Sequence, residues 1–361
     1  MLNSTFGRID CSVPVDYIIL MNRRILLAAS LALCGAGFAP NGFAQGSPAP
    51  GKPTGEISAA ARKFLASLED SQRGKVVFDF KDEAQRKRWS NLPTSFVKRG
   101  GLRIGDLTKP QREAVLAVLA AALSPSGYEK VLQIMEADEV LKKSTGQTIF
   151  GRDDYYVSFL GQPSITEPWM IQFGGHHLGL NLTLVGEQGT LAPSHTGAQP
   201  AIFEFEGKTV RPLGREADKA FALIASLDEA QRKQAILGFQ MRDLALGPGR
   251  DGQTIQPEGI KGSALAEKQR EMLLDLASEW TSIMREALAK AKMDELKKHI
   301  AETWFAWSGP TEKGSAAYFR IQGPTLIIEY APQRMGGEPT RHIHTIYRDP
   351  TNDYGTKWRT P

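Results

Sequence analysis

One stretch of this chain occurs twice, and this repeat restricts the possible folds more than any other feature. Residues 65–73 read LASLEDSQR and residues 224–232 read IASLDEAQR, an offset of 159 residues. A second pair follows at an offset of 158 residues, because the sequence Gln-Arg-Glu at 111–113 recurs at 269–271. Two motifs that recur in the same order and at nearly the same separation predict an internal duplication, in which each copy is one structural unit.

Each copy is expected to begin with a pair of amphipathic helices. Ser67 with Asp70, and Ser226 with Glu229, have the spacing of a helix N-cap and its returning acid. Farther along, apolar residues recur at spacings of three and four, which predicts helices that each bury one face. These residues are Leu116, Leu119, Ala120 and Leu123 in the first copy, and Leu273, Leu276, Trp280, Ile283 and Met284 in the second. The repeated Gln-Arg pairs could be ligands for an anion, but exposed first-turn residues or helix-to-helix hydrogen bonds are the simpler interpretation.

After the helices, each copy changes to the alternating pattern of strands. The alternating segments are 155–160, 169–173 and 178–184 in the first copy, and 304–307, 318–321 and 326–330 in the second. The expected fold class is therefore α+β, built as a tandem duplication of a helical pair followed by antiparallel β-hairpins. The first α+β repeat is expected at 56–212 and the second at 213–361. We expect the two repeats to pack about a pseudo-twofold axis.

The N-terminal region has the features of an export signal. Arg23 and Arg24 precede an apolar stretch at 25–39, small residues at 42–44 suit a signal peptidase, and Met21 is the natural start. The expected segments are residues 1–20 upstream of the true start, a signal peptide at 21–44 and a linker rich in Gly, Pro and Ser at 45–55. The mature protein is expected in the periplasm or secreted, after export by either the general or the twin-arginine pathway.

Composition limits the chemistry of the mature chain. Cys11 and Cys34 are the two cysteines and both lie in the removed part, so a metal site would use His, Asp, Glu or Asn ligands instead of thiolates. The chain has 44 basic and 40 acidic residues, a net charge of +4, and no run of five like charges. Nucleic acid is therefore not an expected partner. With 41% apolar residues the composition is that of a globular protein, and no membrane span is expected in the mature protein.

Histidine is scarce, and it is concentrated in the strand-rich ends of the two copies. Five of the six histidines lie there: His176, His177, His195, His342 and His344. His342 and His344 are two residues apart, so on a strand their imidazoles project from one face and could bind one metal at about 2.0–2.1 Å. His176 and His177 follow Gly174-Gly175 and are expected to open the strand at 178–184. Because they are adjacent, at most one is expected in the same ligand set unless the glycines bend the chain.

A carboxylate could complete this metal site. His177 is expected to share a strand face with Asn181, and the position that matches Asn181 in the second copy is Glu329. A set of His and Glu ligands suits copper, iron, manganese or zinc. The alternative is that the imidazoles only form hydrogen bonds to carbonyl groups at the interface between the copies.

Two further residues are catalytic candidates. His195, expected in a loop at 193–197, could act as a general base. Arg348 begins a tail at 348–355 that is rich in turn formers, and it could bind a substrate carboxylate through two hydrogen bonds. The sequence has no Gly-x-Ser-x-Gly elbow, no Walker phosphate loop and no dinucleotide-binding Gly-x-Gly-x-x-Gly after a strand.

Two segments resemble one protein family. The sequence GGHHLG at 174–179, and above all HIHTIYRDP at 342–350 with NDYG at 352–355, is similar to the domain of unknown function 3500 family. The resemblance extends over residues 57–355. It implies an exported protein of bacterial type and lends weight to the four histidines in these segments. It implies no activity, because the activity of that family is uncharacterised.

These observations predict an exported metal-dependent enzyme, with a transition metal held near the junction of the two copies by His342, His344, one or both of His176 and His177, and Glu329. Copper, iron or manganese would indicate an oxidoreductase that acts on a small molecule. Zinc would indicate a hydrolase. The metal would lower the pKa of its bound water toward about 7, and a nearby carboxylate or His195 would act as the general base. A different class also fits the sequence, a non-catalytic periplasmic module that binds a ligand with its aromatic strands.

Overall fold

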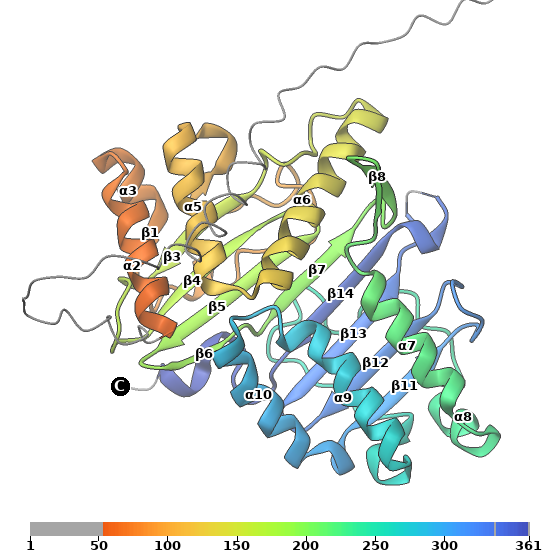
Figure 1. Cartoon of the computed structure of the whole chain (residues 1–361). Coiled ribbons are helices and arrows are strands. Elements are labelled where there is room, and N and C mark those ends of the chain that lie inside the picture. The colour runs from red at the N-terminus through yellow and green to blue at the C-terminus, as the bar shows by residue number, and fades with distance from the viewer. Residues whose placement is uncertain (1–52, 336, 360–361) are drawn as a thin grey trace, which may run out of the picture. The chain divides into compact units, whose positions relative to one another are not determined.

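The computed structural model describes residues 53–335 and 337–359 (Figure 1). The expected signal peptide at 21–44, the residues before it and most of the expected linker lie outside the described residues. Helices and strands are both abundant in the described chain, which confirms the α+β class. No helix within these residues is long and apolar enough to cross a membrane.

In the first half of the described chain, most helices precede the strands. Its helices are α2 (Pro53–Ala66), α3 (Asp70–Val76), the short α4 (Glu83–Arg86), α5 (Lys109–Ala122) and α6 (Pro125–Thr145), with a 3₁₀ turn η1 (Ile104–Asp106). Its strands are β1 (Val77–Phe78), β2 (Leu102–Arg103), β3 (Tyr156–Leu160), β4 (Trp169–Gly175), β5 (Leu178–Val185), β6 (Gln188–Thr190), β7 (Ser194–Ala198), β8 (Phe203–Phe205) and β9 (Lys208–Val210).

The second half has a similar order of elements. Its helices are α7 (Gly214–Ser226), α8 (Glu229–Ala235), α9 (Glu267–Thr281) and α10 (Glu286–Lys298), with 3₁₀ turns η2 (Gly262–Ala264), η3 (Ile300–Glu302), η4 (Pro339–Arg341) and η5 (Asp353–Trp358). Its strands are β10 (Ile260–Lys261), β11 (Trp304–Ser308), β12 (Tyr318–Gly323), β13 (Leu326–Pro332) and β14 (Ile343–Arg348).

Twelve strands of the described residues form one sheet, and the strand order reverses at its centre. The order is β1-β3-β4-β5-β7-β14-β13-β12-β11-β10, with β2 beside β3 and β6 beside β5. Except for the parallel pair β1–β3, these neighbours are antiparallel. The two halves are joined where β7 pairs with β14, from Ile343 opposite Ala198 to Tyr347 opposite Ser194.

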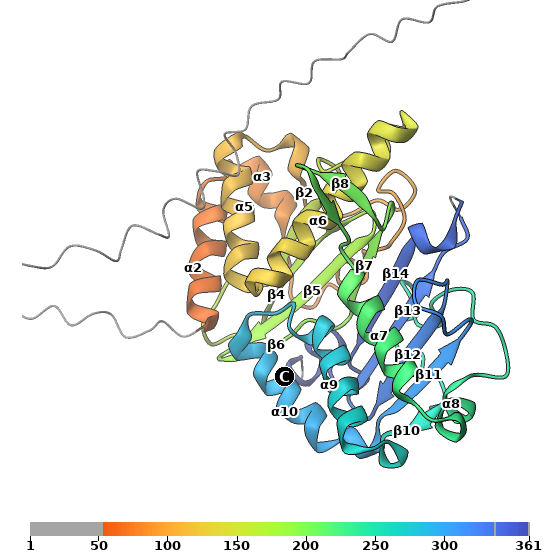
Figure 2. The same ribbon diagram turned by 45° about the vertical axis from the view of Figure 1, so that its right-hand side comes forward.

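Helices cover one face of this sheet, and irregular segments cover the other. Figures 1 and 2 show α2, α5, α6, α7, α9 and α10 on the same side of the strands. Leu178, Leu180 and Leu182 alternate along β5 and join the apolar core that also contains the helices. On the opposite face, segment 79–101 packs on the first half, where the Trp89 ring lies against Gly179. Segment 236–259 packs in the same way on the second half.

The repeated glutamines link neighbouring helices, which confirms the simpler interpretation of the Gln-Arg pairs. On α5, the amide of Gln111 donates to the carbonyl of Ser67 and to Gln72 of α3. In the second half, Gln269 on α9 bonds in the same way to Gln231 on α8. The amide hydrogen bonds therefore fix how each short helix packs against its longer neighbour.

The expected N-caps at Ser67 and Ser226 are wrong by two residues. The capping residues are Glu69 and Asp228, each of which forms a capping box with the glutamine three residues on. Ser67 instead directly follows α2, Ser226 is the last residue of α7, and each hydroxyl donates to the carbonyl three residues back.

The junction of the two halves gives a prediction about stability. The hydroxyl oxygens of Thr345 on β14 and Thr196 on β7 lie 2.7 Å apart, and Trp280 on α9 donates to Thr345. Both threonines are buried. Thr345→Val preserves the shape but leaves two buried polar groups without a partner, so we expect the free energy of unfolding to fall by about 1–3 kcal/mol in urea denaturation.

Thr254→Val is the matched control, because Thr254 is exposed and lies away from the junction. This control should change the free energy of unfolding by less than about 0.5 kcal/mol. Equal losses in the two variants would contradict a special role for the buried hydroxyl pair.

Candidate metal centre

His176 and His177 form a turn and do not open β5, so that expectation is wrong. Gly175 ends β4 opposite Leu178, which begins β5, and the two histidines are the two residues between them. His177 adopts φ of +60°, in the left-handed region that a turn requires. A Cβ atom on Gly174 would come within 2.3 Å of the carbonyl oxygen of Leu178. The tandem glycines thus let the hairpin close tightly. Because His176 and His177 lie in a turn, their side chains do not have to point to opposite faces as they would on a strand.

His342 and His344 share a strand face, as their spacing predicted. His342 is extended, with φ of −135° and ψ of 112°, and it directly precedes β14. The Nε2 atoms of the two imidazoles lie 3.0 Å apart. Their rings are nearly perpendicular, with an interplanar angle of 88°. The two Nε2 atoms therefore converge on the same small region.

The pairing of β7 with β14 brings the β4–β5 turn to the same place. Gly197 on β7 donates to the carbonyl of His177 and lies opposite His344 on β14. His177 Nε2 is 3.0 Å from His342 Nε2, although the two residues are 165 positions apart in the chain. His177, His342 and His344 are all buried, and one ligand atom of each lies within 4.8 Å of the others. We call these three residues the histidine cluster.

The outer nitrogens of His342 and His344 contact groups of the surrounding chain. His342 Nδ1 donates to the carbonyl of Met335 at 2.7 Å, so its Nε2 carries the single lone pair. His344 Nδ1 lies 3.3 Å from the Asn91 amide, which segment 79–101 contributes. Burial, with a smaller effect of neighbouring imidazoles, keeps the pKa values of His177 and His344 well below the ordinary value. These contacts orient the rings of His342 and His344, and the lowered pKa values keep His177 and His344 uncharged near neutral pH.

Asp138 is a buried carboxylate beside the cluster that the sequence reasoning missed. It lies on α6, and its two oxygens accept hydrogen bonds from Tyr155 and His176 at 2.9 Å each. Its Oδ1 atom is also 3.3 Å from His177 Nδ1. Burial raises the pKa of Asp138, and His176 opposes that effect. Among the described residues, neither lysine nor arginine forms an ion pair with it.

One signal in the sequence could have identified Asp138. It lies among Ile134, Met135 and Leu141 on the buried face of α6, where an unpaired carboxylate is energetically unfavourable. Asn91, by contrast, lies in an irregular segment with no periodicity. Nothing in its sequence surroundings indicates that it reaches His344.

His195 lies next to the cluster, on strand β7 and not in the loop that the sequence suggested. Ser-His-Thr-Gly-Ala lacks apolar alternation because this central strand is buried on both faces. The His195 ring is 5.2 Å from that of His344 between centroids, and neither of its nitrogens has a hydrogen-bond partner among the described residues. Burial lowers its pKa to about 3, which makes it a weak base.

Glu329 and Arg348 lie in another network and hold segment 236–259 against the sheet. Glu329 accepts hydrogen bonds from Tyr318 at 2.6 Å and from the backbone of Ala245 and Leu246 at 2.8 Å each. Arg348 donates to the carbonyls of Leu246 and Gly247 and pairs with two aspartates. The structure therefore does not bring either side chain to the histidine cluster.

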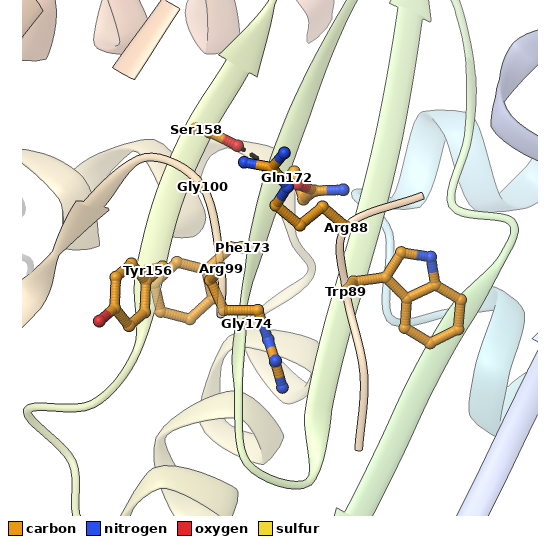
Figure 3. A pocket seen from close by; sticks show the side chains of 9 residues that line it. All are labelled: Arg88, Trp89, Arg99, Gly100, Tyr156, Ser158, Gln172, Phe173 and Gly174. Atoms are coloured by element: carbon orange, nitrogen blue, oxygen red, sulfur yellow. Dashed lines mark hydrogen bonds between the residues drawn. The ribbon is translucent and has the colours of Figure 1, made fainter. Parts of the chain in front are cut away.

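Two cavities lie at Arg99 and Tyr156, and His177, His342 and His344 line neither of them. Figure 3 shows Arg88, Trp89 and Arg99 on a segment that crosses the strands, around a cavity of about 10 Å³ that is the size of one water. A larger hollow of about 340 Å³ lies on the other side of Arg99 and Tyr156. Arg99 donates to the carbonyl of Gly175, next to the histidine turn. The larger hollow is lined by Thr94, Ser95, Lys98, Arg99, Thr148, Ile149, Asp154 and Tyr156.

The lowered pKa of His195 predicts a pH dependence of stability. In the unfolded chain a histidine titrates near pH 6.5, so between about pH 6.5 and 3 the unfolded state binds one more proton at this residue. The stability linked to neutral His195 is complete above that range and is lost as the pH falls through it. We expect metal-free protein to lose up to about 1.4 kcal/mol per pH unit from this residue. Urea unfolding in chelator at several pH values should show a smaller slope for His195→Leu, and identical slopes would contradict the assignment.

Comparison with known proteins gives a family. Residues 50–356 match the model of a family described as a protein of unknown function (DUF3500). No curated protein and no solved structure matches the chain. The family match contains the histidine turn, β7 and the whole of β14. Because it extends over most of the chain, this protein belongs to the DUF3500 family of proteins of unknown function.

Proposed function

We propose that His177, His342 and His344 bind one transition metal ion, and that the protein is an exported metal-dependent enzyme. One observation carries this proposal. Both His177 Nε2 and His344 Nε2 lie 3.0 Å from His342 Nε2, whose other ring nitrogen donates to a carbonyl. A nitrogen with one lone pair can accept only one of these two contacts as a good hydrogen bond. A shared cation would satisfy all three nitrogens together.

The distances within the cluster suit a metal. Ligands bound at about 2.0–2.1 Å, with bond angles between about 90° and 109°, are separated by about 2.9–3.4 Å. Both 3.0 Å contacts fall in this range. Three imidazoles leave a fourth position of a tetrahedral ion free for a substrate, as is usual in catalytic sites.

Charge balance also supports a cation at the cluster. Asp138 is buried beside His177 and forms no ion pair with lysine or arginine among the described residues. An isolated buried carboxylate is costly. A divalent ion at Nε2 of His177 would bring a compensating positive charge near this carboxylate.

The class of chemistry follows from the metal. Copper, iron or manganese would supply electron transfer to a small molecule, and we propose an oxidoreductase as the first candidate. Zinc would supply a hydrolytic site, but His195 is a weak base at its lowered pKa, and Asp138 is already bonded on both oxygens. The hollow of about 340 Å³ is of the size that binds small molecules, and its lining residue Arg99 donates to the carbonyl of Gly175, next to the histidine turn. A non-catalytic ligand-binding module is the remaining alternative.

We also propose that the two halves are a tandem duplication related by a pseudo-twofold axis. Each half has strands in mirrored order around the β7–β14 pair, where Thr196 lies opposite Thr345. On the helical side, Leu123 after α5 forms an antiparallel bridge with Met284 after α9. Segments at similar places in the two halves thus meet at two points, which supports an axis through the junction.

The metal proposal is tested by elemental analysis. We expect protein purified without a histidine tag to carry at least about one copper, iron, manganese or zinc ion per chain. His342→Ala/His344→Ala should lose the ion at this cluster, because it removes two of three ligands, while circular dichroism reports whether the variant folds. His299→Ala, which removes a histidine at the end of α10, is the matched control and should keep its metal. Absence of metal from the parent protein, even after incubation with all four ions, would overturn the proposal.

Export is tested by the mature N-terminus. The proposed signal peptide at 21–44 predicts a periplasmic or secreted product that begins near Gln45. Mass spectrometry of the protein from that compartment should find this terminus. If Arg23→Lys/Arg24→Lys stops export, the twin-arginine pathway is used, and unchanged export indicates the general pathway. A cytoplasmic protein that retains residues 21–44 would contradict export.

A further inference from the structure

A second group of buried ligand atoms lies on the other side of the His177 ring. Asp138, His176 and His177 each offer one such atom, and these atoms lie within 4.8 Å of one another. His177 therefore belongs to two candidate metal groups, with its Nε2 facing His342 and its Nδ1 facing Asp138. The two groups share this one residue and are buried.

We propose that His177 bridges two metal ions as an imidazolate. The first ion is the one already proposed at His177 Nε2, His342 and His344, and the second binds to His177 Nδ1, His176 Nδ1 and Asp138 Oδ1. The inference rests on the proposed function and adds a second transition-metal site to it.

The first observation that supports a second ion is the environment of His177 Nδ1. It is fully buried and has no hydrogen-bond partner among the described residues. Asp138 Oδ1 is 3.3 Å away, but the contact lacks the alignment of a hydrogen bond. A buried polar atom without a partner is costly, and a group outside the protein chain would satisfy it. A metal ion in front of Nδ1 would do so and would also contact the adjacent oxygen.

The distances between the ligand atoms of Asp138, His176 and His177 also suit one metal ion. His176 Nδ1 and His177 Nδ1 lie 2.9 Å and 3.3 Å from the same oxygen of Asp138. Ligands at about 2.0–2.1 Å from one ion are separated by about 2.9–3.4 Å, so both distances fit. The two rings are close, with centroids 3.5 Å apart and planes tilted by 33°. The histidine turn thus brings two adjacent residues to one carboxylate, which a regular strand would not do.

Protons and charges balance in this arrangement. His177 gives up its last ring proton to solvent when the second ion binds, and His176 keeps its remaining proton on Nε2. The imidazolate and the Asp138 carboxylate together supply two negative charges between two divalent ions. Tyr155 continues to donate to the other oxygen of Asp138 and fixes its orientation. No oxidant or reductant is required for binding.

Copper(II) is the probe, because nitrogen and oxygen sites bind it more tightly than other divalent ions of the series, whichever metal is native. Metal-free full-length mature protein is titrated with copper(II), desalted and analysed for copper. We expect two ions per chain in the parent protein. Electron paramagnetic resonance should show a signal per copper that is strongly reduced at full loading, because an imidazolate bridge couples the two spins.

Asp138→Asn should bind one copper(II) per chain and show the full signal of an isolated ion. His176→Gln is the second variant, used because either change could disturb folding, and circular dichroism checks both. Asp294→Asn is the matched control on the surface of α10 and should behave as the parent protein.

The outcomes separate the two proposals. One ion per chain in the parent, lost in His342→Ala/His344→Ala and kept in Asp138→Asn, would overturn the bridge and leave the three-histidine site. Two ions without spin coupling, or two ions retained in both Asp138→Asn and His176→Gln, would also overturn it. Failure to bind any copper would overturn both proposals.

Discussion

The pairing of β7 with β14 is the interaction on which the rest of the structure depends. It joins two half-sheets into one and places Gly197 opposite His344. Gly197 also donates to the carbonyl of His177, so the β4–β5 turn is fixed to the same strand pair. The histidine cluster forms only where these contacts coincide. The backbone of each of the three histidines is thus held by hydrogen bonds of neighbouring strands.

The two sides of the sheet have different roles. On the helical side, Thr196, Thr345 and Trp280 close the junction with hydrogen bonds inside an apolar core. On the other side, the irregular segments bring polar groups to the strands, Asn91 to His344 and the backbone of Ala245 to Glu329. Only the first of these contacts lies at the histidine cluster. Segment 79–101 thus completes the candidate site, whereas segment 236–259 supplies hydrogen bonds to a buried carboxylate.

Much of this architecture could be predicted, but the site only in part. Periodicity indicated helices followed by hairpins, and the spacing of His342 and His344 placed both on one face. The same reasoning failed at His176 and His177, because it assumed a regular strand where the chain turns with φ of +60° at His177. It also failed at Glu329, because a matching position in a repeat need not face the same surroundings. Asp138 was missed because its contact with His176 depends on how α6 packs over the sheet.

The sequence by itself determined the family, the α+β class, the absence of cysteine from the residues after Cys34 and the concentration of histidine in the strand-rich segments. These properties depend on local patterns and composition, which can be read without coordinates. Only the tertiary structure decided which nitrogens meet, because His177 and His342 are 165 residues apart and are joined through strand pairing. It also decided that Arg348 and Glu329 hold a covering segment. Burial and hydrogen-bond partners are set by packing, and packing depends on residues far away in the chain.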